Sequence, residues 1–422
     1  MSFISEKIAE DVYLHIAPTD KFKTVTINIY VNNVLGENAT EYALIPSVLK
    51  RGTNKINTYK DMSKYLESLY GSTLSASVYK KGERHIQQYR MEMIQEDFIH
   101  EKIFEKGVEF LRDLIFNPFV ENKAFKKEYV DQEIEIQKNN INGRKNDKTK
   151  YAIERCLEEM CKGEPFSIYE LGDIESLNNI DEKSLFNYYK KHIEIFPVDI
   201  FVVGDVDIKY IISIFKRYFN LERNEVLEIP KTNIFKEVKQ IKYVKDYMDV
   251  TQGKITLGFR TNVEPDSEEY YSLLIYSGIL GGGPFSKLFM NVREKESLAY
   301  YAFSRLERFK GLMIIGAGIE PENYDKAIEI INLQLKDLEK GNISDYEFDS
   351  TIKSLKTSIN AIKDSATSIS DYYFSQKIVK TDVDIDQFIK NIEKVTKKDV
   401  VDISRKIKLD TVYFMSNQKE VK

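Results

Sequence analysis

The segment Lys254–Arg260 (KITLGFR) decides the fold, because it repeats, late in the chain, the strand-like pattern of Thr24–Val31 (TVTINIYV). The surrounding stretches recur in the same order. Residues 410–417 (DTVYFMSN) echo 198–205 (VDIFVVGD), and Leu335 follows Leu111 by 224 positions (335 − 111). This spacing is far too long for a solenoid repeat, so the pattern indicates a duplicated domain.

Each half is predicted to hold two adjacent strands followed by a long helix. These are strands 73–80 and 84–93 with helix 98–115, and strands 300–306 and 309–317 with helix 324–338. Further helices are predicted at 41–50, 58–71, 125–138, 149–161, 182–192 and 267–280, with a polar break at 139–147. The order favours an α+β class, with two homologous α/β sandwich halves, each a mostly antiparallel sheet with helices packed on it. The predicted domains are 1–220 and 250–422, joined by a linker at 221–249.

The composition excludes several classes of function. There are 62 Lys and Arg against 67 Asp and Glu, a net charge of −5, which argues against nucleic acid as a partner because phosphate binding needs a cationic face. The sequence has no apolar run of about 18 residues and no signal peptide at its start, so no membrane role is expected. The two cysteines, Cys156 and Cys161, cannot form a disulfide framework, which predicts a reducing, cytoplasmic compartment.

The residues alone do not predict a self-contained metal or nucleophile site. The four histidines are His15, His85, His100 and His192. No two of them are three or four residues apart, the spacing that places two zinc ligands on one face of a helix. A Gly-x-Ser-x-Gly elbow is absent. The run LGGGP at 280–284 lacks the Gly-Lys-Ser/Thr ending of a phosphate loop, so we interpret it as a turn between two helices.

One pair of polar residues stands out in the segment that follows this turn. Arg293 and Tyr300 are seven residues apart, the first on a predicted helix and the second entering a strand. A forked cation and a phenolic donor could together hold a peptide carbonyl or a developing oxyanion. The spacing itself favours the alternative, a surface Arg beside Glu294 and a half-buried Tyr. Both interpretations stay open at this point.

The segment 280–304 (LGGGPFSKLFMNVREKESLAYYAFS) closely resembles the C-terminal signature of the pitrilysin-like metallopeptidases, which include insulysin and the mitochondrial processing peptidase. Residues 201–207 (FVVGDVD) resemble the strand that closes a domain in this family. The duplicated halves agree as well, so the resemblance covers nearly the whole chain. It implies two α/β halves that form one side of a clam-shell chamber.

The family's zinc motif is the inverted His-x-x-Glu-His, just before a Lys/Arg-Gly-Thr. The Arg-Gly-Thr at 51–53 places this motif where the chain has Ala43, Pro46 and Ser47 instead of the two His and the catalytic Glu. Ala and Pro offer no ligand or acid–base group, and a lone Ser hydroxyl is a poor zinc ligand. Glu128 resembles the downstream Glu that supplies the third ligand, here left as a solvated or ion-paired helix residue. The resemblance therefore implies that this chain binds no metal and is not active alone.

Arg293 and Tyr300, in contrast, match the family's Arg and Tyr that bind substrate near the metal. In two-subunit members, one chain carries zinc and the other is degenerate. The resemblance thus implies a bacterial, non-catalytic subunit that binds peptide and pairs with a zinc-bearing sister in a heterodimer. A stand-alone peptide-binding or structural protein on an inactive peptidase scaffold is the alternative. An autonomous metallopeptidase with a relocated site is disfavoured by the missing ligand pair.

Overall fold

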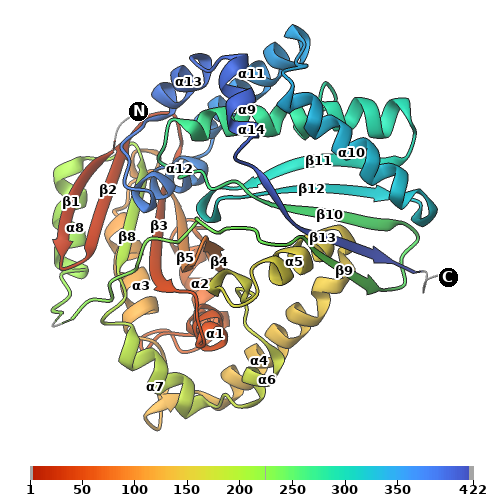
Figure 1. Ribbon diagram of the computed structural model, residues 1–422. Helices are drawn as coiled ribbons and strands as arrows, with labels where there is room; N and C mark the ends of the chain where they lie inside the picture. Colours follow the sequence, from red (N-terminus) through yellow and green to blue (C-terminus); the bar gives the residue numbers. More distant parts are fainter. Residues whose placement is uncertain (1–2, 224, 418–422) are drawn as a thin grey trace. The chain divides into compact units, whose positions relative to one another are not determined.

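The computed structural model describes residues 3–223 and 225–417 of the 422-residue chain. It divides into two compact units. Unit 1 comprises Met1–Asn142, Ile168–Lys231 and Lys363–Ser375, and unit 2 comprises Gly143–Ser167, Thr232–Ile362 and Gln376–Lys422. Each unit is a mixed α/β layer structure, as the sequence predicts (Figure 1).

Unit 1 is built on a six-stranded sheet in the order β1-β2-β8-β3-β5-β4. Its strands are β1 (Ile4–Ala9), β2 (Val12–Pro18), β3 (Thr24–Val34), β4 (Thr73–Lys81), β5 (Arg84–Ile94) and β8 (Val198–Gly204), with a small hairpin of β6 (Val120–Glu121) and β7 (Ala124–Phe125). Its helices are α1 (Ala39–Leu49), α2 (Tyr59–Ser68), α3 (Phe104–Phe116), α4 (Lys127–Gly143), α6 (Ile174–Asn178), α7 (Glu182–His192), α8 (Ile208–Tyr218) and most of α12 (Ala366–Ile378).

Unit 2 is built on a five-stranded sheet in the order β11-β12-β10-β13-β9. Its strands are β9 (Lys242–Tyr247), β10 (Gly253–Arg260), β11 (Ala299–Glu307), β12 (Leu312–Ile319) and β13 (Lys408–Ser416). Its helices are α5 (Lys148–Met160), α9 (Glu269–Gly281), a π-helix (Phe289–Lys295), α10 (Tyr324–Glu339), α11 (Asp345–Asn360), α13 (Ile385–Glu393) and α14 (Lys397–Ser404).

The two sheets have the same topology. The corresponding strands β3 and β10 lie inside their sheets, β3 between β5 and β8 and β10 between β12 and β13. One parallel pair occurs in each sheet at the corresponding place, β2 with β8 and β9 with β13, while the other pairs are antiparallel. The duplication predicted from the sequence is therefore present strand by strand, except that β1 has no counterpart among the described residues of unit 2.

The unit boundaries differ from the predicted domains 1–220 and 250–422 in two ways. The predicted linker 221–249 contains β9, which pairs with β13 as a strand of the second sheet. Residues 143–167 lie in the predicted N-terminal domain but belong to unit 2. Residues 363–375 lie in the predicted C-terminal domain but belong to unit 1. The reason is packing: α5 covers the sheet of unit 2 through Ala152 and Cys156, which no local pattern reveals. The predicted polar break at 139–147 also differs, since α4 continues to Gly143.

The central strand of unit 1 shows why this sheet is covered on both faces. Val25, Ile27, Ile29 and Val31 of β3 point into the main core, which they share with side chains of α1, α3 and α8. The alternate residues face α12: Asn28 donates a hydrogen bond to Ser370 Oγ at 3.1 Å. Tyr30 stacks on Phe374 with ring centroids 4.0 Å apart. The continuous burial of β3 follows from this two-sided covering.

A buried charge cluster fastens the loop after α5 to the sheet of unit 2. Glu164 forms ion pairs with Arg260 at 2.7 Å and with Lys310 at 2.8 Å, and Lys236 also contacts this carboxylate. Arg260 and Lys310 are 0% and 1% exposed. Burial opposes ionisation of Glu164, but the hydrogen bonds from the three cations outweigh it and lower the pKa of this carboxyl to about 2.

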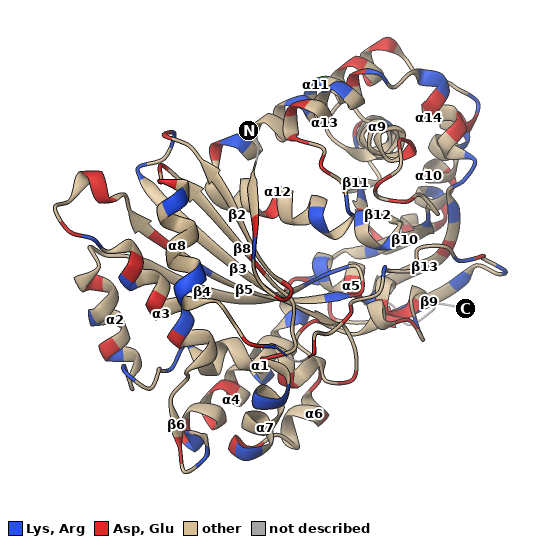
Figure 2. Cartoon of the chain, turned by 90° about the vertical axis from the view of Figure 1, so that its left-hand side faces the viewer, with Lys and Arg blue, Asp and Glu red and all other residues tan. Residues whose placement is uncertain are grey.

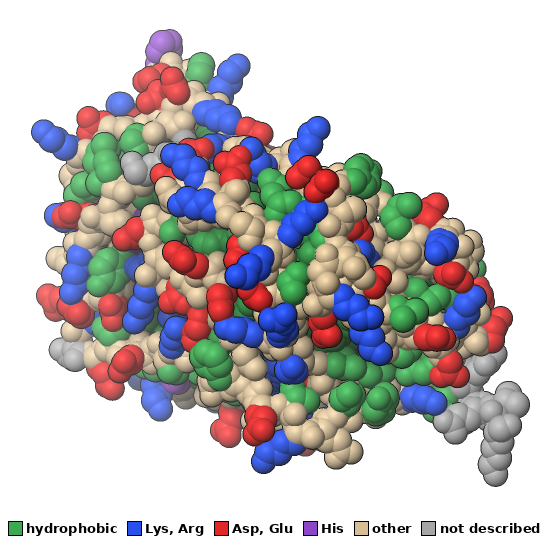
Figure 3. All heavy atoms as spheres, turned by 45° about the horizontal axis from the view of Figure 1, so that its top comes forward, with side chains coloured by type: hydrophobic (Ala, Val, Ile, Leu, Met, Phe, Trp, Pro, Cys, Tyr) green, Lys and Arg blue, Asp and Glu red, His purple; other side chains and the backbone are tan. Residues whose placement is uncertain are grey.

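Charges of both signs are distributed over the molecule. Most red and blue stretches in Figure 2 lie on helices and loops, and the face in Figure 3 carries Lys, Arg, Asp and Glu interspersed with hydrophobic side chains. That face has no extended patch of a single sign, in agreement with the nearly balanced composition. Among the described residues, none of the helices combines the length and apolar character that crossing a bilayer requires.

Candidate functional site

The degenerate motif positions lie on α1, a helix that is buried on almost all sides. Ala43 and Pro46 are buried, whereas Ser47 is exposed. Pro46 lacks the N–H that would bond to the carbonyl of Tyr42 in a regular helix. Gln87 on β5 supplies the missing donor, with its side-chain Nε2 2.8 Å from the Tyr42 carbonyl oxygen. The helix thus tolerates a proline in its interior because a neighbouring strand completes its hydrogen bonding.

A cavity of about 150 Å³ opens beside Ala43, Pro46 and Ser47. Its other walls are α4, the segment before α6, and β4, which is the edge strand of the sheet. A second hollow of about 200 Å³ shares Ser47 with it. The lining residues of the two, besides the motif positions, are Ala76, Ser77, Val78, Glu133, Ile136, Gln137, Asn140 and Leu171 for the first and Lys50, Arg51, Tyr59 and Glu133 for the second.

The carboxylate that faces both hollows belongs to Glu133 on α4. It is 7% exposed, and the guanidinium of Arg51 forms an ion pair with it through Nε and Nη2. Glu128, the predicted third-ligand position, does not line either hollow. Its side chain is 62% exposed and pairs with Lys126 at 3.1 Å. Of the predicted residues, the structure therefore brings together Ala43, Pro46 and Ser47, and places Glu133 rather than Glu128 beside them.

The period of α4 contains the signal that separates these two glutamates. Val130, Glu133, Ile134 and Gln137 are its buried residues, spaced three or four apart on one face. Glu128 lies off this face. The helical period set by Val130 and Ile134 identifies Glu133 as the carboxylate that faces inward. The resemblance of residues 126–133 (KKEYVDQE) to the family segment selected Glu128 instead.

Arg293 and Tyr300 lie in a second region, within unit 2. Arg293 is near the end of the π-helix, and Val292 beside it is fully buried and anchors the turn. The Arg293 guanidinium lies 4.5 Å from the ring centroid of Phe289, and its Nε is 3.7 Å from a carboxylate oxygen of Glu294. The side chain remains 43% exposed. The structure thus shows both the contact with Glu294 and an accessible guanidinium.

Tyr300 is the extra residue of a β-bulge at the start of β11. Ala299 pairs with Ile319 and Tyr301 with Gly318, so Tyr300 has no partner of its own on β12. It is 55% exposed. Its hydroxyl donates to Glu320 Oε1 at 2.6 Å, and this hydrogen bond raises the pKa of the phenol.

The backbone between these two side chains is irregular at three points in succession. A π-helix ends at Lys295, Ser297 has a φ of +53°, and the bulge follows at Tyr300. Each of these features costs free energy relative to regular structure, and each is enriched at functional sites. The concentration of three in one segment of unit 2 distinguishes it from the regular strands around it.

The segment containing both residues matches a known family. A family model described as the peptidase M16 inactive domain matches residues 179–355. The probable inactive metalloprotease YmfF of Bacillus subtilis is 36% identical over 420 residues, covering 98% of both chains. The chain belongs to the M16 metallopeptidase family. The predicted resemblance to the pitrilysin-like metallopeptidases is confirmed.

Two further comparisons support the assignment. The uncharacterized zinc protease YmxG of Bacillus subtilis is 26% identical over 194 residues, 45% of this chain and 46% of the relative. A conserved protein from Enterococcus faecalis V583 has a crystal structure that matches all of both chains with a TM-score of 0.93 and 27% identity. The predicted fold of two homologous α/β halves is confirmed, and the chain is a homologue of an inactive M16 metalloprotease.

The donors at the M16 motif positions do not fit a zinc ion. A catalytic zinc site takes three protein ligands, usually His, Cys, Asp or Glu, but the cavity at α1 is lined by only one side chain of these types, the carboxylate of Glu133. That carboxylate, on Glu133, is already neutralised by Arg51. Across the described ranges 3–223 and 225–417, no cluster of three or more His, Cys, Asp or Glu side chains is close enough to hold a metal.

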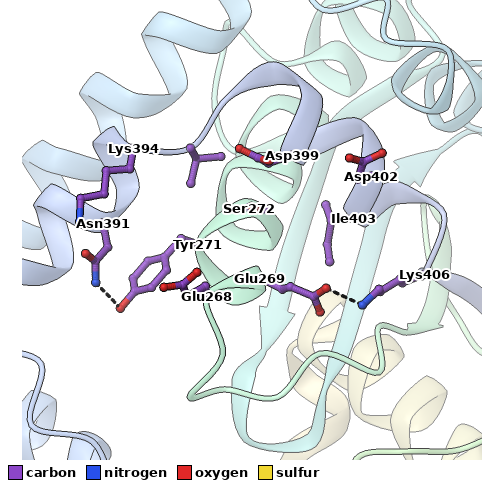
Figure 4. A pocket seen from close by; sticks show the side chains of 11 residues that line it. Glu268, Glu269, Tyr271, Ser272, Asn391, Lys394, Asp399, Asp402, Ile403 and Lys406 are labelled. Atoms are coloured by element: carbon purple, nitrogen blue, oxygen red, sulfur yellow. Dashed lines mark hydrogen bonds and ion pairs between the residues drawn. The ribbon is translucent and has the colours of Figure 1, made fainter.

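Unit 2 has a larger cavity, of about 430 Å³, between α9, α13 and α14 (Figure 4). Two contacts join residues that line it and are drawn as dashed lines in the figure, Glu269 with Lys406 at 2.5 Å and Asn391 with Tyr271 at 3.0 Å. The lining includes four carboxylates and two lysines, all of them exposed. Neither Arg293 nor Tyr300 lines this cavity.

Proposed function

We propose that this chain is the non-catalytic subunit of a heterodimeric M16 peptidase, and that it contributes Arg293 and Tyr300 to a chamber whose zinc is bound by a sister subunit. The carrying observation is the irregular segment that presents both side chains. This segment contains a π-helix, Ser297 in the left-handed conformation and a β-bulge. The side chains of Arg293 and Tyr300 are both exposed. The motif positions on α1 lack ligands, so the chemistry must come from another chain.

The expected contribution follows from the two side chains. Arg293 supplies a permanent cation with several donors, and Tyr300 supplies one phenolic donor on a rigid ring. Both can bind the carbonyl oxygen of a peptide and stabilise negative charge that develops on it. Tyr300 must first leave Glu320, or share its proton with it, because the phenol has a single O–H and this bond uses it.

The test is reconstitution with a zinc-bearing M16 sister that carries an intact His-x-x-Glu-His motif. Each chain alone is expected to be inactive, and the mixture to cleave peptides with one zinc per heterodimer. Arg293→Ala or Tyr300→Phe should lower turnover by about 10²–10³. Arg305→Ala, an exposed arginine on the same strand as Tyr300, and Tyr346→Phe, at 70% exposure, are matched controls. Unchanged turnover in both site variants would refute the proposal.

A second candidate is a stand-alone peptide-binding protein, favoured by the cavity at α1. Among the strands of the described residues, β4 pairs with β5 alone and is an edge strand, and residues 76–78 of this strand line the cavity. A peptide strand added along this edge could place one small side chain into the 150 Å³ hollow. Tight peptide binding by the isolated chain, weakened by Ala43→Leu, would support this function, whereas activity only in the presence of a sister supports the first.

A further inference from the structure

The cavity between α9, α13 and α14 has the size of a ligand site (Figure 4). Its volume of about 430 Å³ lies within the range of about 300–1,000 Å³ that small-molecule sites occupy. All eleven residues that line it belong to unit 2. Glu268 and Ser272 on α9 are four residues apart, as are Asp399 and Ile403 on α14, so each pair projects from one face of its helix. The cavity is therefore built from helix faces within a single unit.

The buried hydroxyl of Ser272 opens into this cavity without a partner. Ser272 is 8% exposed, and its hydroxyl forms no hydrogen bond with any residue that the structure describes. Ser277, on the same helix and 7% exposed, has its Oγ 2.8 Å from Ser304 Oγ. Buried hydroxyls in folded proteins normally have a partner, because an unpaired one costs free energy. The Ser272 hydroxyl is therefore available to a molecule that enters the cavity.

The lining of the cavity carries more negative than positive charge. Its four carboxylates and two lysines give a net charge of −2 (2 − 4). Lys406 is paired with Glu269 at 2.5 Å. Neither the Glu268 carboxylate nor the Lys394 ammonium has an ion pair or hydrogen bond within the described part of the chain. A concave site lined mainly by one sign of charge attracts ions of the opposite sign, so this cavity favours a cation.

Two aspartates of α14 keep one carboxylate oxygen each for a ligand. Asp399 accepts hydrogen bonds from the N–H and the hydroxyl of Thr396 at 2.8 and 2.7 Å, both through Oδ2. These bonds lower the pKa of Asp399 and keep it ionised. Asp402 contacts Arg405 at 3.3 Å through Oδ1. In Figure 4, both aspartates lie in the upper part of the view and Glu268 lies in the lower part. Acceptors thus stand on two helices, α14 and α9.

The spacing of these acceptors favours an organic cation over a metal ion. In the ranges 3–223 and 225–417, His, Cys, Asp and Glu side chains form no group of three or more that could hold a metal. An alkylammonium has three N–H donors and needs only two or three acceptors around it. Tyr271 and Ile403 add apolar surface to the lining, against which methylene groups can pack. A chain of methylenes with an ammonium at each end matches this arrangement.

We propose that this cavity binds an aliphatic diamine in its dicationic form. One ammonium donates hydrogen bonds to the Glu268 carboxylate and the Ser272 hydroxyl on α9. The other donates to the second oxygens of Asp399 and Asp402 on α14. The dication neutralises the net charge of the lining, and added salt should weaken its binding because the carboxylates are exposed. Lys394 opposes the ligand, since its ammonium has no partner that offsets its charge.

The test is isothermal titration calorimetry of the full chain with cadaverine, a five-carbon diamine, at low ionic strength. The wild type should show saturable one-to-one binding. Glu268→Gln and Ser272→Ala should each raise the Kd by about three- to tenfold, because each removes an acceptor of the same ammonium. Glu329→Gln, at an exposed carboxylate on α10 outside the cavity, should leave the Kd unchanged. Absence of saturable binding, or an equal loss in Glu329→Gln, would overturn the proposal.

Two further measurements test the charge and the length of the ligand. Lys394→Gln should lower the Kd for cadaverine, because it removes a like charge from the lining, and a higher Kd would contradict a cationic ligand. Pentylamine, with a single ammonium, should bind at least about tenfold more weakly, and equal binding would refute the two-ammonium arrangement. Circular dichroism should show the wild-type fold in Glu268→Gln and Ser272→Ala, since neither side chain bonds to another described residue. These results do not depend on whether a zinc-bearing sister activates the chain.

Discussion

Gln87 donates a side-chain hydrogen bond to the backbone carbonyl of Tyr42 at 2.8 Å. That carbonyl is the group that Pro46, four residues later, leaves without a helical donor. Gln87 is 1% exposed and also accepts a hydrogen bond from the Tyr89 hydroxyl at 2.8 Å. Pro46 inside α1 is thus accommodated by a specific polar contact from the sheet.

This contact predicts a measurable coupling between residues 46 and 87. Gln87→Leu should destabilise unit 1 by about 1–3 kcal/mol, because the Tyr42 carbonyl loses its donor inside the core. In the Pro46→Ala background, the N–H of residue 46 can reach this carbonyl, so the same substitution should cost less. The loss of the Tyr89 partner is common to both backgrounds and cancels in the double-mutant cycle. Urea unfolding of the four proteins gives the coupling, and additive effects would contradict the assignment.

The Glu164 cluster in unit 2 predicts a specific dependence of stability on pH. The folded-state pKa of Glu164, about 2, lies below its ordinary value of 4.5. A carboxyl with a depressed pKa stabilises the fold at pH values above its unfolded pKa, and this stabilisation is lost as the pH falls from about 4.5 toward 2. Glu164→Gln should flatten the pH dependence of unfolding in this window. At pH 7 it should also cost on the order of 3 kcal/mol, because Arg260 and Lys310 keep their charges in the core.

Glu194→Gln is a suitable control for this measurement. Glu194 is exposed and lies in unit 1, outside the Glu164 cluster. Its removal should leave the slope between pH 4.5 and 2 as in the wild type. An equal change of slope in both variants would assign the acid sensitivity to general charge repulsion instead of the cluster.

The contact between Tyr300 and Glu320 predicts a shift in a tyrosine titration. The hydrogen bond to the Glu320 carboxylate stabilises the protonated phenol and raises its pKa. Glu320→Gln removes the negative charge, so the pKa of Tyr300 should fall toward its ordinary value. Phenolate absorbance of Glu320→Gln, minus that of Glu320→Gln/Tyr300→Phe, isolates this residue from the other tyrosines. The absorbance of the wild type minus that of Tyr300→Phe gives the reference titration of Tyr300. Identical midpoints of the two difference titrations would show that the contact does not persist in solution.

The sequence predicted most strands of the two sheets, because β-branched and apolar runs such as Thr24–Val31 carry their own signal. It did not predict β1 and β2 of the first sheet or β9 of the second. The internal duplication and the family signature at 280–304 also depend on local pattern, and both led to the correct fold. The assignment of α5 to the second sheet, and of β9 to a sheet strand, depends on contacts between distant segments. These contacts exist only once the chain has folded, so composition and periodicity could not reveal them.

The candidate site shows the same division. Ala43, Pro46 and Ser47 were placed by a linear motif and lie together on one cavity. The helical period of α4 decides which of its carboxylates faces inward, and the motif resemblance alone did not distinguish Glu133 from Glu128. The bulge at Tyr300 and the π-helix before it are departures from regular geometry, for which the sequence carries no periodic signal.

Restoring the two histidines should create a zinc site that identifies the third ligand. Ala43→His/Ser47→His places two imidazoles at i and i+4 on α1, facing the cavity that Glu133 lines. This variant should bind zinc, measured by chelator competition, and Arg51→Ala should tighten binding because it frees the Glu133 carboxylate. Adding Glu133→Ala should weaken affinity at least tenfold, whereas Glu128→Ala should not, since Glu128 is exposed and outside the cavity. The reverse order would restore Glu128 as the third-ligand position.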